Sequence, residues 1–121
     1  MIVVSEGRFT QPNSEPDLML EPDAVAEDVD FAGRDLIAIR FPSSADGRGN
    51  SIAKRLRLLG YTGRLRASGH VLADQYPLAL RCGFDEVEID DALAARMPEA
   101  QWAEAMERVE LNYQDRLKRA G

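Results

Sequence analysis

The sequence predicts a small single α/β domain whose mostly parallel sheet has three to four strands and flanking helices. The length of 121 residues suits one domain. Hydrophobic residues make up 45% and charged residues 30%, as in an ordinary globular protein. Within residues 36–90, short apolar runs alternate with segments of helical periodicity. This order is typical of parallel strands joined by right-handed crossovers.

Residues 36–90 are expected to form a βαβαβ core. The nearly continuous apolar run 36–41 predicts a buried parallel strand. A second strand is expected over 64–68. The segment 86–89 alternates polar and apolar residues, which predicts a third, half-exposed strand. A sheet this small leaves a face or edge without cover, so a homodimer is one expectation.

Two helices are expected between these strands, over 51–59 and 74–82. Asn50 or Ser51 is predicted to cap the first, and Asp74 the second. Glycines at 60 and 83 are placed to end the two helices. Proline at position 77 would lie in the first turn of the second helix, where its missing N–H costs little.

The flanking parts are less regular. The N-terminal part, 1–35, is acidic, and we expect a short strand over 2–4. Residues 18–20 form either an edge strand or a hydrophobic anchor, and 23–30 a short helix capped by Asp23 that buries Val25. The C-terminal part, 91–121, is expected to hold helices over 92–97 and 99–111, broken at Pro98.

The charge is segregated along the chain. Residues 1–47 carry three basic and ten acidic residues, net −7, and residues 82–121 carry five basic and ten acidic residues, net −5. Residues 48–81 carry seven basic residues and one acidic residue, net +6. A basic block between acidic ends predicts either a solvated face or a docking face for an acidic partner. Because the whole chain is acidic, at net −6, nucleic-acid binding is not expected.

Some classes of protein are disfavoured. No apolar run approaches the roughly 20 residues that a membrane-spanning helix needs, and no signal peptide is recognisable, so we expect a cytoplasmic protein. The single cysteine, Cys82, cannot form an intramolecular disulfide. No metal-ligand spacing, nicotinamide fingerprint or cluster-binding cysteine set is present, so no metal or cofactor is expected.

The loop after the first parallel strand is the best candidate binding site. It contains Asp46 and Arg48 beside two glycines and leads into Asn50 and Ser51 at the start of a helix. Free N–H groups at a helix start, with a nearby arginine, favour an oxyanion such as sulfate, sulfite or phosphate. The alternative is an ordinary capped turn in which Asp46 and Arg48 pair on the surface.

Two further sets of residues are candidates. His70 follows the second strand beside Asp74 and is either a general acid or base or a surface histidine. In the basic block, Arg55, Arg57 and Arg64 are candidate docking residues because Tyr61 beside them looks exposed, and arginine–tyrosine pairs are frequent interface anchors. The alternative is that these arginines pair with the acidic ends of the same chain.

Residues 41–88 carry a more specific pattern. It consists of Asp46-Gly47-Arg48-Gly49 with Ser51, then Leu56-Arg57, Gly60-Tyr61, Leu65-Arg66-Ala67, Gly69, Val71-Leu72, Asp74-Gln75 and Cys82-Gly83-Phe84-Asp85. In this pattern the chain resembles the bacterial domain-of-unknown-function family 934. It departs from the family at Pro77, where a large apolar helix residue is expected.

The resemblance implies a pathway and carries over no catalytic residue. Genes of this family commonly lie beside those for sulfite reductase and other steps of assimilatory sulfate reduction. The expected function is therefore an accessory or binding protein of that pathway, which recognises an oxyanion or a partner enzyme such as sulfite reductase. The alternative is a small oxidoreductase or other sulfur-metabolism enzyme that uses the loop with Asp46, Arg48 and His70.

Overall fold

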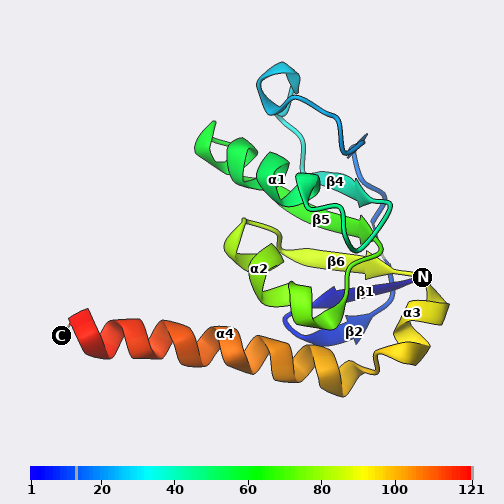
Figure 1. Ribbon diagram of the computed structural model, residues 1–121. Coiled ribbons are helices and arrows are strands. Elements are labelled where there is room, and N and C mark those ends of the chain that lie inside the picture. Colours follow the sequence, from blue (N-terminus) through cyan, green and yellow to red (C-terminus); the bar gives the residue numbers. More distant parts are fainter. Residues whose placement is uncertain (13, 121) are drawn as a thin grey trace.

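A single six-stranded sheet organises the chain (Figure 1). The computed structural model describes residues 1–12 and 14–120, with side chains described as far as residue 109. The strand order is β2-β1-β6-β5-β4-β3. The strands are β1 (Ile2–Ser5), β2 (Arg8–Thr10), β3 (Leu18–Leu20), β4 (Leu36–Phe41), β5 (Arg64–Gly69) and β6 (Glu86–Ile89).

The four strands β3 to β6 are parallel, and β1 and β2 run antiparallel at one end of the sheet. The parallel strands predicted over 36–41, 64–68 and 86–89 are thereby confirmed, and residues 18–20 form an edge strand. The expectation that 86–89 is half-exposed was wrong, because Glu86, Val87 and Ile89 are all buried. The predicted total of three to four strands was too low. The sheet is mixed because the hairpin β1–β2 adds two antiparallel strands beside β6.

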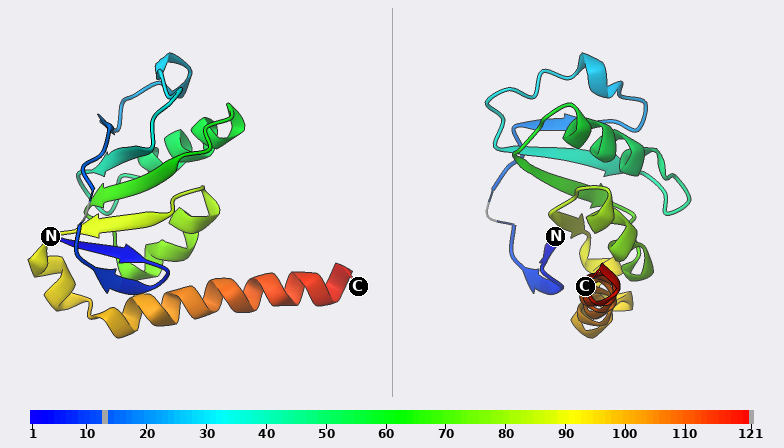
Figure 2. Two further views of the ribbon diagram at one scale, coloured as in Figure 1. Left: turned by 180° about the vertical axis from the view of Figure 1, so that it is seen from behind. Right: turned by 90° about the vertical axis from the view of Figure 1, so that its left-hand side faces the viewer.

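The helices cover one face of the sheet (Figure 2). The hydrophobic core lies between that face and the helices, and it includes Ile37 and Ile39 of β4 and Leu56 of α1. The opposite face is crossed by the connection from β2 to β3 and carries no helix among the described residues. The helical elements are η1 (Ala26–Asp28), α1 (Arg48–Leu58), η2 (Ala73–Gln75), α2 (Tyr76–Arg81), α3 (Asp91–Arg96) and α4 (Glu99–Ala120).

Helix α4 is attached to the domain through Trp102. This side chain is fully buried, and its ring meets the ring of Tyr76 edge-on at 5.4 Å between centroids. Its indole N–H donates to the carbonyl of Met97 at 3.0 Å. The Tyr76 hydroxyl in turn accepts a hydrogen bond from the Gly7 amide at 3.2 Å, in the turn of the β1–β2 hairpin. These contacts join α4, α2 and the hairpin.

Several predicted helix boundaries were wrong. The predicted helix over 23–30 is only the single turn η1, and Val25 is 54% exposed rather than buried. Helix α1 begins at Arg48 with Gly47 as its N-cap, so Asn50 and Ser51 lie inside the helix. The helix begins three residues before Ser51, directly after Gly47, so the polar residues at 50 and 51 do not mark its start.

The second crossover helix also begins differently. The single turn η2 precedes α2, and the Leu72 amide donates to Gln75 Oε1 at 3.0 Å, so Asp74 is not the cap. Pro77 lies in the first turn of α2, as predicted. Gly60 and Gly83 follow α1 and α2 with φ of +106° and +109°, which confirms both as helix ends.

The C-terminal part agrees more closely with expectation. Helices α3 and α4 are separated at Pro98, as predicted, but α4 continues to Ala120 rather than ending at 111. Within the described residues, no helix combines the length and the apolar character that crossing a bilayer requires.

Candidate functional site on the uncovered sheet face

Alternation along β5 and β6 places charged side chains on the uncovered face of the sheet. Leu65 and Ala67 of β5 are fully buried in the core on the helix side. Because successive strand residues point to opposite faces, Arg64, Arg66 and Ser68 lie on the uncovered side. The same rule places Glu86 and Glu88 of β6 beside them, since Arg66 pairs with Glu86 and Ser68 with Glu88 in the register of the two strands.

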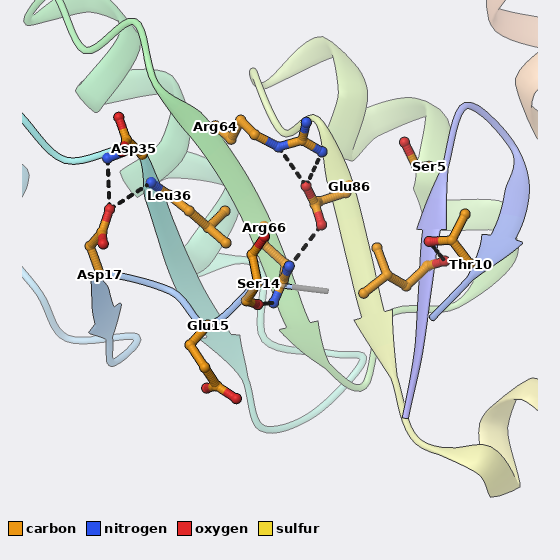
Figure 3. A pocket seen from close by; sticks show the side chains of 11 residues that line it. Ser5, Thr10, Ser14, Glu15, Asp17, Asp35, Leu36, Arg64, Arg66 and Glu86 are labelled. Carbon is orange, nitrogen blue, oxygen red and sulfur yellow. Dashed lines mark hydrogen bonds and ion pairs between the residues drawn. The ribbon is translucent and has the colours of Figure 1, made fainter. Parts of the chain in front are cut away.

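These side chains form a connected ionic network, of which Figure 3 shows Arg64, Glu86 and Arg66. Glu86 accepts from Arg66 Nε through Oε2 at 3.0 Å and from Arg64 Nε through Oε1 at 2.9 Å. Arg66 Nη1 lies 3.4 Å from a carboxylate oxygen of Glu88, whose other oxygen accepts from the Ser68 hydroxyl at 3.2 Å. The Glu86 carboxylate also raises the pKa of Arg64. A carboxylate held between two guanidiniums is fixed in position before any ligand arrives.

The centre of the network is buried although no helix covers it. The side chains of Arg66 and Glu86 are each only 3% exposed. The β2–β3 connection passes over them, and Arg66 Nη1 donates to the carbonyl of Ser14 at 3.2 Å. The network therefore anchors this connection to the sheet.

Asp17 fixes the far end of the same connection. Its carboxylate accepts hydrogen bonds from the backbone amides of Asp35 at 2.7 Å and Leu36 at 3.0 Å, at the start of β4. These two bonds, the stronger influence coming from Leu36, hold the pKa of Asp17 below its usual value. The charged form of Asp17 is the form that orders this connection.

Three adjoining hollows lie on the uncovered face. The first, of about 490 Å³, is lined by Arg64, Arg66, Glu86 and residues of the β2–β3 connection. The second, of about 360 Å³, lies against Arg66 and Glu88. The third, of about 540 Å³, reaches the carboxyl ends of the parallel strands, where its lining includes Ser68 and His70.

The loop predicted to bind an oxyanion is occupied by the chain's own carboxylate. Asp46 accepts from the Arg48 amide at 3.2 Å and from the Arg48 guanidinium at 3.0 and 2.8 Å. The Arg48 guanidinium lowers the pKa of Asp46, and the carboxylate raises the pKa of Arg48. The Asn50 amide donates to the Gly47 carbonyl at 3.1 Å, and Ser51 is exposed on α1. This geometry is the surface pair that the sequence left as the alternative.

The structure places His70 and Asp46 in different hollows. His70 is exposed and lines the third hollow of the uncovered face. Asp46 lines a separate cleft of about 210 Å³ between α1 and α2, where the buried Oδ1 of Asn50 has no described partner. Asp74 is exposed on η2 and lines neither of these two hollows. These residues do not form one constellation. Among the described residues, no group of three or more His, Cys, Asp or Glu side chains is arranged for a metal ion.

The candidate docking arginines all have acidic partners within the chain. Arg55 pairs with Glu27, Arg57 with Asp85 and Arg64 with Glu86. The arrangement matches the alternative in which the basic block is neutralised by the chain's own acidic ends. The prediction that Tyr61 is exposed was wrong.

Tyr61 is only 4% exposed, and its hydroxyl lies within hydrogen-bond distance of the carbonyls of Arg34 and Arg64. Burial raises the pKa of this hydroxyl, whereas the charge of Arg57 partly opposes the rise. Tyr61 therefore fills the core beneath the end of α1, where an interface anchor is not accessible.

Comparison with known proteins then decides the family. The family model described as a bacterial protein of unknown function, DUF934, matches residues 17–120. The chain belongs to the DUF934 family. The DUF934 match begins at Asp17, so it includes β3 to β6 and excludes the β1–β2 hairpin. No curated protein and no solved structure matches this chain.

The residues that sequence reasoning missed in this DUF934 chain are Arg66, Glu86 and Glu88. Their alternation with apolar residues predicts that they share a face, but the contacts among them depend on the register of β5 against β6. The β2–β3 connection that buries them has no local sequence signal beyond its prolines.

Proposed function

We propose that this DUF934 chain is an accessory binding protein of assimilatory sulfate and sulfite reduction, and that it recognises a partner enzyme through the uncovered face of its sheet. The family resemblance supports the pathway. One observation supports the surface: a sheet covered by helices on one side only presents on its other side a fixed array of charged side chains flanked by hollows.

The basic helix α1 is a weaker candidate for that surface. Its arginines at 55 and 57 are already paired with acidic groups of the chain, so a partner would have to replace existing contacts. Binding of sulfate, sulfite or phosphate at the start of α1 stays a prediction, and it requires the oxyanion to displace the Asp46 carboxylate from Arg48. A partner that binds the exposed edges of the uncovered face does not have to break an existing ion pair.

The test is co-purification of a tagged full-length chain from its native cell, with mass spectrometry of the bound proteins. We expect sulfite reductase, or another enzyme of sulfate assimilation, to be enriched over a tag-only control at low ionic strength. Absence of every enzyme of that pathway from the bound fraction, both with and without chemical cross-linking, contradicts the proposed function.

A further inference from the structure

The hollows of the uncovered face form one continuous surface. The first and second share Ser14, Glu15 and Arg66, and the second and third share Met19 and Glu88. Ser14 and Glu15 of the β2–β3 connection line both the first and the second hollow. A partner seated on this face therefore meets this connection as well as the hollows.

The side chains that line this surface are predominantly acidic. Six carboxylates face three guanidiniums, so the charges of these groups sum to −3. The ammonium of Met1 pairs with Asp91 and the guanidinium of Arg40 pairs with Glu21, both carboxylates outside the hollows, so neither cation offsets the acidic lining. The carboxylates are Glu15, Asp17, Asp35, Glu86, Glu88 and Asp90, and the guanidiniums are Arg40, Arg64 and Arg66.

Two of these carboxylates are available for a partner. Glu86 and Glu88 are held by Arg64 and Arg66. Asp17 accepts from two backbone amides, and Asp90 accepts from the Leu93 amide. In contrast, Glu15 and Asp35 are exposed, and no ion pair within the described part of the chain engages either of them. They line the same first hollow, and in Figure 3 both lie to the left of the buried network.

From this geometry we infer that the uncovered face binds a protein surface that presents lysine or arginine side chains. The inference rests on the proposed function only in taking the occupant to be a protein. A cationic side chain that enters the first hollow meets the free carboxylates of Glu15 and Asp35, and complementary charge directs such a surface to this face during encounter. Because the buried network is already satisfied internally, binding does not require it to rearrange.

Other occupants fit the charge poorly. A second copy of the chain would place one net-negative face against another, and like charges in contact are unfavourable. Nucleic acid and anionic lipid headgroups carry the same sign as the face. A basic protein surface is the occupant whose charge is complementary.

The test uses the full chain and a fluorescently labelled nine-residue lysine peptide as the basic probe. The groove variant is Glu15→Gln with Asp35→Asn, which removes two exposed charges and keeps the side-chain shapes. The matched control is Glu104→Gln with Glu107→Gln, which removes two exposed charges from α4 on the helix side. Each exposed charge pair contributes roughly 2- to 5-fold in affinity, so the groove variant is expected to bind about 4- to 25-fold more weakly.

The outcomes separate this inference from the proposed function. The inference is supported if the affinity for the peptide falls in the groove variant but stays within about 2-fold of wild type in the control. An exposed charge contributes only where it pairs with the peptide. Equal weakening in both variants, or no wild-type binding at millimolar peptide, overturns it. Capture of sulfite reductase that the groove variant leaves unchanged also overturns the inference but leaves standing the proposal that the chain binds an enzyme of that pathway. Peptide binding that weakens in the groove variant, without capture of any pathway enzyme, supports the inference and contradicts the proposed function.

Discussion

Replacing Arg57 with alanine tests whether the basic block stabilises the fold. Its guanidinium donates to the carbonyls of Tyr61 at 3.0 Å, Gly63 at 2.6 Å and Gly83 at 2.8 Å, and to the carboxylate of Asp85 at 2.9 Å. The cation also lies 5.5 Å from the centre of the Tyr61 ring. One side chain thus joins the loops that follow α1 and α2.

The expected loss follows from the carbonyls that the substitution leaves without a donor. The Arg57 side chain is 26% exposed, so water rehydrates these groups only in part. At about 1 kcal/mol for each of three carbonyls, Arg57→Ala should lower the free energy of unfolding by about 3 kcal/mol. With a urea m value near 1.5 kcal/mol/M, the unfolding midpoint falls by about 2 M.

Arg55→Ala is the matched control, two residues away on the same helix. Arg55 pairs with Glu27, and both side chains are about half exposed, so its loss should cost less than about 1 kcal/mol. Urea unfolding of both variants, followed by far-ultraviolet circular dichroism, compares the two. Equal midpoints for Arg57→Ala and Arg55→Ala would refute the argument that Arg57 is a structural crosslink.

Three further predictions concern packing and pH. Gly49→Ala should lower the free energy of unfolding by about 1–3 kcal/mol, because its new Cβ would lie 2.6 Å from the Phe41 ring. In the control Gly47→Ala the new Cβ has no atom within 4 Å, so the free energy of unfolding in urea should stay within about 0.5 kcal/mol of wild type. Trp102→Ala should cost about 3–5 kcal/mol and release α4, seen as faster amide exchange along that helix. The pKa of Asp17 is lowered in the folded chain, so its contribution to stability is present above about pH 4 and lost on acidification; Asp17→Asn should flatten that part of the stability–pH curve.

The parallel part of the fold could be predicted because its signals are local. The run Leu36–Ile39 is apolar on both faces, and Gly60 and Gly83 mark the ends of the helices that follow β4 and β5. The β1–β2 hairpin was missed because β2 has only three residues and its turn is Glu6-Gly7. Both turn residues have positive φ, +53° and +76°, as a type I′ hairpin turn requires, but Glu-Gly is a weaker signal than Asn-Gly.

The candidate site was harder to predict because it depends on pairing between distant segments. Asp46 and Arg48 are close in sequence, so either outcome for them, a surface pair or an anion site, could be anticipated. The bond from Arg66 to Glu86 requires the register of β5 and β6, and the bond from Arg66 to Ser14 joins residues 52 positions apart. No local periodicity contains that information.

The position of β1 has a consequence for how the chain folds during synthesis. Ile2 of β1 pairs with Ile89 of β6, so the first strand made must wait for the last strand of the sheet. At translation rates of 5–20 residues per second, the wait between these two residues is roughly 4–17 s. The strands β3, β4, β5 and β6 leave the ribosome in the order in which they lie side by side, and each can join its neighbour as it appears. The β1–β2 hairpin therefore joins the sheet late, after β6 has formed the edge strand with which β1 pairs.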